Sequence, residues 1–261
     1  MSTIPEPPKG VNTHEHGPAA PHRVRRPVMR MTWENLTFLH WAYPAEDVQR
    51  LLPEGVEAEP WEGKAWVSLV PLYMRVRPPF GPAVPGLTTF PETNVRTYVT
   101  GPGGDPGVWF FSLDATNPAA VAAGRTALGL PYFLSKMEFT RAGDSLRYKG
   151  RRAGFRAGRA SHRIEVEAGE EIAPSDLTDL DHFLTARFRL WSVNRGVVLL
   201  SDQEHAPWRL RRATVHALEQ DLLEHAGLPG PTGEPIVHVA DRMDVRVGAP
   251  HIASRWQPAL P

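Results

Sequence analysis

A lysine inside an apolar, strand-like segment is the first residue whose type and position suggest chemistry. Lys136 lies in the segment ALGLPYFLSKMEFT, and only four of the 29 basic residues of the chain are lysines. A lysine that is desolvated and close to other cations has a lowered pKa, so it can be neutral and nucleophilic near pH 7. Such an amine can form a Schiff base with a carbonyl substrate.

The orientation of Lys136 follows from strand geometry, because alternate side chains of an extended segment share a face. Lys136 then points to the same side as Tyr132 and Glu138, and we expect this side to face an internal cavity. There, Arg75 or Arg96 would lower the pKa of the lysine. In the alternative interpretation, Lys136 extends to water or pairs with Glu138 and takes no part in chemistry.

The segment FPETNVRTYV carries a second set of polar side chains. One face of an extended strand would present Glu92, Asn94, Arg96 and Tyr98. The segments VWFFSL and AWVSLV are apolar at nearly every position, which is typical of strands covered on both faces. A polar row in such a sheet would line a cavity, with Arg96 paired because an unpaired buried guanidinium is costly. The alternative is a row that faces solvent.

The segment SDQEH places two acids and a histidine at nearly the spacing of metal ligands. On a strand, Asp202 and Glu204 face one side and His205 the other, which favours a solvated strand end. The chain has no G-x-G-x-x-G, Walker, HExxH or GxSxG motif, so nucleotide binding, zinc proteolysis and α/β-hydrolase chemistry have no support. We expect neither a metal nor a cofactor.

The composition narrows the class of protein. A formal net charge of zero and a pI of about 7.2 argue against binding to nucleic acid phosphates. The absence of cysteine excludes disulfides and thiolate catalysis and suits a reducing cytoplasm. No segment resembles a signal peptide or a membrane span. We expect a soluble cytoplasmic protein with a small-molecule ligand, and a homo-oligomer is left open.

The elements that position the candidate residues are mostly strands. Residues 1–27 are rich in proline, glycine and histidine and predict a disordered tail that adds nothing to the core, and 28–261 predict a single domain. Apolar and β-branched segments predict strands at 29–43, 64–78, 131–140, 161–169 and 236–247, and hairpins within 94–115 and 188–205.

Helices are expected between some of these strands. The segment PAEDVQRLLPEG predicts a short one. A second begins at Asn117 as N-cap with Pro118 in its first turn and ends at Gly129. A third is capped by Ser175, and a fourth covers 214–225. Many hairpin-connected strands with few helices indicate an α+β fold.

Several segments together resemble a known family. They are LTFLHWAYP, LLPEGVE, GKAWVSLVPLYM, PGLTTFPETNVRTYV, GVWFFSLDATN, LPYFLSKM, FLTARFRLW and HAPWRL, spread over Met31 to Val247. They are similar to the YqjF-like family of bacterial proteins, which is grouped with acetoacetate decarboxylase-like folds. The resemblance implies a curved antiparallel β-barrel or cone with helices packed outside and a cavity within.

The resemblance does not extend to the catalytic lysines. Acetoacetate decarboxylase has the pattern G-[FY]-P-K-K, whose first lysine forms the Schiff base, and GLPYF places Tyr132 and Phe133 at the two lysine positions. Lys136 lies about 13 Å further along the strand and would be a fixed charge for an anionic ligand rather than the nucleophile. Glu92 resembles the glutamate in the decarboxylase cavity.

Three functions remain open at this point. The first is a binding barrel for a small anionic or carbonyl-containing metabolite, held by Arg96, Asn94, Arg75 and Tyr98. The second is an enzyme acting on an oxo acid, in which Glu92 or Tyr132 moves protons and Lys136 is a nucleophile or fixed charge. The third is a structural or interaction protein.

Overall fold

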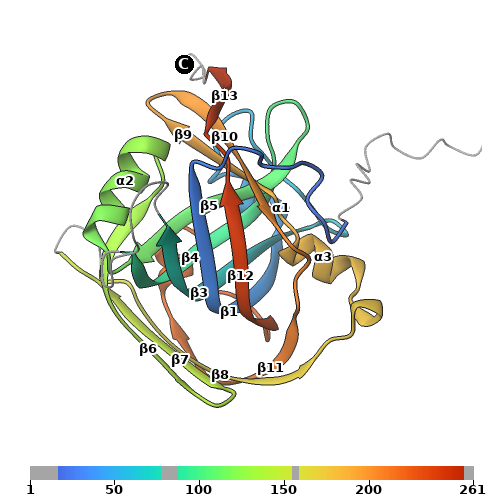
Figure 1. The fold of residues 1–261 in the computed structure, drawn as a ribbon, viewed down its shortest axis with the longest axis vertical. Coiled ribbons are helices and arrows are strands. Elements are labelled where there is room, and N and C mark those ends of the chain that lie inside the picture. The colour runs from blue at the N-terminus through green and yellow to red at the C-terminus, as the bar shows by residue number, and fades with distance from the viewer. Residues whose placement is uncertain (1–16, 78–87, 155–158, 256–261) are drawn as a thin grey trace, which may run out of the picture.

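The computed structural model describes residues 17–77, 88–154 and 159–255 of the 261-residue chain, and strands dominate it (Figure 1). The described residues form thirteen strands, which belong to a single sheet. The strands are β1 (Met29–Pro44), β2 (Glu57–Ala58), β3 (Lys64–Arg77), β4 (Thr89–Thr100), β5 (Pro106–Ala115), β6 (Tyr132–Ala142), β7 (Ser145–Arg152), β8 (Ser161–Glu171), β9 (Arg189–Asn194), β10 (Val197–His205), β11 (Arg211–Gln220), β12 (Ile236–Val247) and β13 (His251–Arg255).

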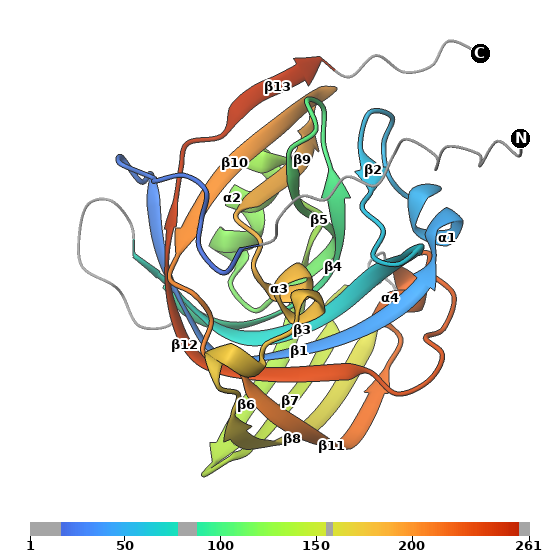
Figure 2. The same cartoon turned by 90° about the vertical axis from the view of Figure 1, so that its right-hand side faces the viewer.

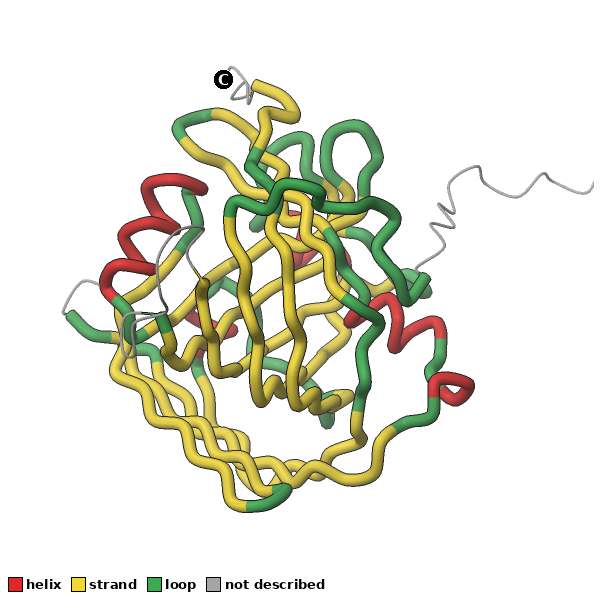
Figure 3. The backbone as a smooth tube through the Cα atoms, viewed as in Figure 1, coloured by secondary structure: helices red, strands yellow, loops and turns green. Residues whose placement is uncertain are grey.

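The helices are short and peripheral. They are α1 (Ala45–Gln49), α2 (Pro118–Leu128), α3 (Asp179–Thr185) and α4 (Leu222–His225), with a 3-10 turn at Pro174–Asp176. The largest, α2, lies at the outer edge of the strands (Figure 3). Asn117 caps it by accepting hydrogen bonds from two backbone N–H groups, and Gly129 ends it in the left-handed conformation, as its sequence predicted.

Two branch points divide the sheet into two closed rings. Strands β12, β1, β3, β4 and β5 form a shared wall. The free edge of β5 pairs with β9 along its first half and with β6 along its second half, and both pairings are parallel. The free edge of β12 likewise pairs with β10 at one end and with β11 at the other.

The first ring therefore closes through β9 and β10, and the second closes through β6, β7, β8 and β11. Figure 2 shows these two groups of strands on opposite sides of β1 and β3. The predicted α+β fold with a curved, barrel-like sheet is confirmed, although the two parallel pairings at β5 make the sheet mixed rather than wholly antiparallel.

The two rings have separate interiors because the wall strands are covered on both faces. Side chains such as Leu39, Leu69 and Val95 pack into the second ring against Leu146 and Ile164. The alternate side chains of the same strands point into the first ring, where Val70, Leu72 and Phe90 form another apolar cluster. Two bulges shift this alternation of side chains locally. One lies in β1 at Asn35, which has φ 52°, and the other lies where β5 pairs with β4.

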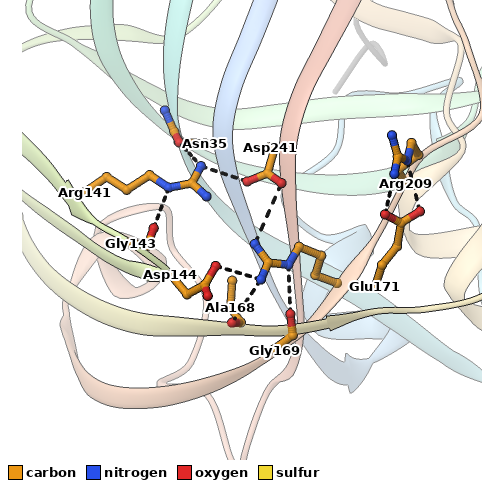
Figure 4. A network of polar contacts seen from close by, with 10 residues as sticks. Asn35, Arg141, Gly143, Asp144, Ala168, Gly169, Glu171, Arg209 and Asp241 are labelled. Atoms are coloured by element: carbon orange, nitrogen blue, oxygen red, sulfur yellow. Dashed lines mark hydrogen bonds and ion pairs between the residues drawn. The ribbon is translucent and has the colours of Figure 1, made fainter.

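A surface network of charges holds the second ring closed where the β6–β7 turn meets β8, β11 and β12 (Figure 4). Asp241 contacts Arg141 at 2.8 Å and Arg211 at 3.8 Å. Arg211 also reaches Asp144 at 2.7 Å and donates to the carbonyl of Gly169 at 2.8 Å. Several charges that share partners in this way hold their geometry better than isolated exposed pairs.

Two local predictions of helices need correction. The helix predicted at 214–225 is mostly strand β11, because pairing with β8 overrides the helix propensity of its Ala, Leu and Glu residues. Helix α3 is capped by Thr178, which forms a capping box with Asp181, and not by Ser175. Burial alternates from residue to residue along β11, which is the pattern of a strand, and the prediction missed this alternation.

The predicted tail also differs in its last third. Residues 1–16 lie outside the described residues. Val24, however, is buried, and its backbone N–H donates to the Glu204 carboxylate at 2.7 Å while its carbonyl accepts from Arg246. This part of the chain is docked on β10 and β12 and does contribute to the core. Within the described ranges, we find no helix long and apolar enough to cross a membrane.

Candidate functional site

The first ring contains a partly open cavity of about 510 Å³. Its wall comes from β1, β3, β4, β5, β10 and one face of α2, and most of the lining is apolar. The polar or ionisable lining residues are Thr88, Glu92, Asn94, Arg96, Tyr132, Thr185, Arg187, Ser201, Gln203 and His205. An apolar pocket of this size with a few convergent polar groups is the usual form of a small-molecule site.

Strand β4 carries the central polar row of the cavity. Glu92, Asn94 and Arg96 point into it, on the face that strand parity predicted, while Val95 between them packs into the second ring. All three polar side chains are buried. The structure thus excludes the alternative of a row that faces solvent.

Glu92 and Tyr132 form a pair in the middle of the cavity. The Tyr132 hydroxyl donates to Glu92 Oε2 at 3.0 Å. Burial raises the pKa of Glu92 to about 7, although hydrogen bonds from Tyr132 and Asn94 oppose the rise. Burial and the neighbouring Glu92 raise the pKa of Tyr132 well above its usual range. The carboxyl group of Glu92 can therefore gain or lose a proton near neutral pH.

Helix α2 fixes the ring of Tyr132 through a glycine. A Cβ atom added at Gly124 would lie 2.4 Å from Tyr132 Cε2, so only glycine lets the ring lie against the helix at this position. The Arg125 side chain also donates to the Tyr132 carbonyl at 2.7 Å. Both contacts hold the tyrosine hydroxyl toward Glu92.

Two arginines lie at one end of the cavity, which we call its inner end; Arg96 is the last residue of β4 in the lining. Arg96 donates to the carbonyl of Leu184 at 3.2 Å and lies 5.3 Å from the centre of the Phe38 ring. Arg187 forms an ion pair with Glu59 and donates to the carbonyl of Phe183 at 2.8 Å. Burial lowers the pKa of Arg187, and the positive charge of Arg96 contributes to this shift, while Glu59 opposes it.

Arg96 therefore differs from the expectation that it would be paired. It takes part in none of the ion pairs found among the described residues, and a backbone carbonyl and aromatic rings take the place of a carboxylate. Among the described residues, Glu59 is the one carboxylate that forms an ion pair with either of the two buried arginines. Glu92, four residues away along β4, stands about 13 Å from Arg96 by strand rise.

His205 completes the inner end. Its ring lies 4.6 Å from that of Phe188 and 5.0 Å from that of Trp208, between centroids. Nδ1 is 2.7 Å from the Ala206 carbonyl, which makes it the protonated nitrogen of a neutral ring. Burial lowers the pKa of His205 and keeps the ring neutral. Nε2 is then an acceptor.

A buried polar network supports the inner end from behind. His40 Nδ1 lies 2.7 Å from Ser68 Oγ, and Ser68 Oγ lies 2.6 Å from the Tyr98 hydroxyl. The Tyr98 hydroxyl donates to the Leu184 carbonyl that also accepts from Arg96. The adjacent His238 reaches Asp181 at 2.9 Å, which ties this network to the capping box of α3.

Several polar atoms at the cavity wall have no hydrogen-bond partner in the described residues. They are Trp33 Nε1, Asn94 Oδ1, Arg96 Nε, Arg187 Nη2 and His205 Nε2. Buried polar atoms are nearly always satisfied by protein or water. All five atoms belong to residues that line the cavity, so unsatisfied polar groups are concentrated around it.

Three residues of the predicted site lie elsewhere. Lys136 is exposed, because β6 leaves the cavity after Tyr132 and the same strand face then meets solvent. Arg75 lies on the face of β3 away from the cavity and pairs with Glu34 at 3.3 Å. Tyr98 is fully buried beneath Arg96 and belongs to the supporting network rather than to the lining.

A second buried cluster lies on the other side of the β4–β5 wall. Asp114 accepts two hydrogen bonds from Arg152, at 2.9 and 3.0 Å, and one from Ser135 at 2.6 Å. The Arg152 guanidinium lies 3.7 Å from the centre of the Phe133 ring. The negative charge of Asp114 adds to the rise in the pKa of Glu92. This cluster is internally satisfied and is structural.

Sequence reasoning missed Arg187 and His205 as cavity residues. Strand parity had separated His205 from Asp202 and Glu204, but the face of His205 was not assigned to the interior. Both residues fall within segments that carried the family resemblance, FLTARFRLW and HAPWRL. No group of three or more potential metal ligands occurs in the parts of the chain that the structure covers.

Comparison with known proteins identifies the family. A model of the DUF2071 family, whose description is an uncharacterized conserved protein (COG2071), matches residues 30–244. The chain belongs to the DUF2071 family. The uncharacterized protein YqjF of Bacillus subtilis (strain 168) is 33% identical over 219 residues, which are 84% of this chain and 89% of YqjF.

The DUF2071 chain is also similar in fold to solved structures. An acetoacetate decarboxylase-like enzyme from Sphingomonas wittichii RW1 matches with a TM-score of 0.62 and 11% identity, over 88% of this chain and 94% of that enzyme. The enduracididine biosynthesis enzyme MppR complexed with pyruvate has a TM-score of 0.62 and 14% identity, over 89% of this chain and 93% of MppR. The fold is thus acetoacetate decarboxylase-like.

Proposed function

We propose that this protein binds a small organic acid in the cavity of the first ring, with the carboxylate at Arg96 and Arg187. The observation that carries the proposal is the buried arginine pair, which has one carboxylate partner among the described residues, Glu59, and two nitrogens, Arg96 Nε and Arg187 Nη2, without a hydrogen-bond partner. A carboxylate at this point would accept charged hydrogen bonds from both arginines.

Carbonyl chemistry through a lysine is not supported. The described cavity wall includes no lysine, and Lys64, Lys136 and Lys149 are exposed. A Schiff base would need a desolvated amine at the ligand. A deep cavity with unsatisfied polar atoms in its lining residues also favours ligand binding over a purely structural role.

Binding of pyruvate tests the proposal, since the similar MppR structure is a complex with pyruvate. Isothermal titration calorimetry with pyruvate should show one site per chain in the wild type. Arg96→Met should weaken binding by at least about 30-fold, because a charged hydrogen bond contributes roughly 2 kcal/mol or more. Arg75→Met is the matched control, because Arg75 lies on the other face of β3, and it should bind as the wild type does. If Arg96→Met binds pyruvate as tightly as Arg75→Met does, the proposal is refuted.

The Glu92–Tyr132 pair favours a second, catalytic function at the same site. A carboxylate with a pKa near 7 is suited to take a proton from the carbon next to a carbonyl group. The C–H electron pair would form a carbon–carbon double bond while the π pair of the carbonyl group moves to its oxygen, which gives an enolate, and return of the proton would reverse the step. Because Glu92 stands about 13 Å from Arg96, the substrate must be an oxo acid whose carbonyl group lies far from its carboxylate, such as 9-oxodecanoate. Loss of the signals of the protons next to its ketone in D₂O, followed by proton NMR, measures this exchange. Exchange that persists in Glu92→Gln would exclude Glu92 as the base.

A further inference from the structure

The apolar part of the cavity bears on the size of the ligand. A cavity of about 510 Å³ has room for roughly 17 water molecules at about 30 Å³ each. Pyruvate has about six non-hydrogen atoms, so it would leave most of this volume unfilled, whereas cavities of this size ordinarily hold larger molecules. A ligand that matches the cavity must therefore be considerably larger than pyruvate.

The polar and apolar parts of the wall are separated along β4. Arg96, Arg187 and His205 lie at the inner end, and Glu92 lies about 13 Å away. Beyond Glu92 in the same direction, the wall is formed by Phe90 of β4 and Met74 of β3. A ligand with its carboxylate at Arg96 would thus extend past Glu92 along apolar side chains.

This apolar part of the cavity, which we call the apolar arm, can also adapt its shape. Met29, Met31 and Met74 contribute to it, and Val76 is a further apolar lining residue. Methionine side chains are flexible and polarizable, and they suit surfaces that contact apolar ligands of variable shape. Empty cavities lined by apolar side chains remain dry and bind apolar molecules. The arm would therefore favour a hydrocarbon group over a second polar group.

We infer that the ligand is a monocarboxylic acid with a long or bulky apolar substituent, whose carboxylate lies at Arg96 and Arg187 and whose hydrocarbon part lies between β1, β3 and β4. This inference rests on the proposed function and specifies its ligand class. This ligand class distinguishes the cavity from a site that accepts only acids of the size of pyruvate.

A series of straight-chain acids from acetate to hexadecanoate tests the inference by calorimetry, because Met74 lies opposite Phe90, about 20 Å along β4 from Arg96. Each added methylene should tighten binding about four-fold, which corresponds to about 0.8 kcal/mol per buried CH₂, until the arm is full. Met74→Trp should reduce the ratio of the hexadecanoate affinity to the acetate affinity by at least tenfold, because the indole occupies the arm. Tyr73→Trp, on the opposite face of β3, should leave this ratio unchanged.

The outcomes separate the two proposals. If no acid binds, or if Arg96→Met binds all acids as the wild type does, both fail. If acetate and pyruvate bind through Arg96 and longer chains bind no better, only the inference about the apolar substituent fails. The inference about the apolar substituent also fails if Met74→Trp retains the full gain in affinity with chain length. Should Met74→Trp not fold, Val76→Trp, at a partly exposed position of the same wall, provides the same comparison.

Discussion

Glu92 should make the stability of this protein depend on pH in a direction opposite to that of a salt-bridged acid. Its folded-state pKa of about 7 lies above the ordinary value of 4.5. Between these values the folded protein keeps a proton that the unfolded chain releases. The free energy of unfolding therefore decreases as the pH rises from about 4.5 to about 7 and is then constant with respect to this group.

The size of the effect follows from the same two values. At about 1.36 kcal/mol per pH unit, the rise from 4.5 to about 7 corresponds to roughly 3 kcal/mol. Glu92→Gln removes the ionisable group while keeping an oxygen that accepts from the Tyr132 hydroxyl. The variant should therefore gain roughly 3 kcal/mol relative to the wild type between pH 4.5 and pH 8.

Urea denaturation of the wild type and of Glu92→Gln across this pH range measures the difference directly. The exposed Glu138→Gln serves as the control and should follow the wild type at every pH. A difference between Glu92→Gln and the wild type that does not change with pH would refute a raised pKa. A difference of the opposite sign would show that the ionised carboxylate is stabilised by a cation in the cavity.

Three further predictions follow from other parts of the structure. Lys136→Met should leave pyruvate binding unchanged, and borohydride reduction with pyruvate should label no peptide that contains Lys136, as judged by mass spectrometry; such a label would show that the exposed lysine enters the cavity. Deletion of the first 27 residues should lower the melting temperature by several degrees because Val24 is buried, and the inference of docking fails if the protein melts as the full chain does. Asp114→Ala should destabilise the protein by about 3–5 kcal/mol in urea denaturation, because it leaves the Arg152 charge buried and unpaired, and a loss below about 1 kcal/mol would contradict this.

Much of the fold and part of the site could be predicted from local sequence. The capping residues of α2 and the hairpin of β4 and β5 are local signals, and the prediction placed both correctly. Strand parity also placed Glu92 and Arg96 in the interior, because the neighbouring segments are apolar at nearly every position and this pattern predicts strands covered on both faces. The two rings were not predictable, since they depend on which strands share the edges of β5 and β12.

The error at Lys136 has the same origin. Parity correctly put Lys136 on the face of Tyr132, but parity does not tell where along a strand that face stops being interior. The cavity ends after Tyr132, and two residues later Leu134 is already 38% exposed. His205 is the opposite case. Parity correctly put His205 and Asp202 on different faces of the strand, but the face of His205 is interior only because β10 pairs with β12 and closes the first ring.

The double covering of β4 determines how this site can change during evolution. Glu92, Asn94 and Arg96 face the cavity, and the side chains between them fill the second ring. Insertion or deletion of one residue in β4 would exchange the two sets and place charged side chains in an apolar core. Within this strand, new ligand preferences can therefore arise only by substitution at alternate positions, and homologous chains should align across β4 without gaps even where their cavities differ in chemistry.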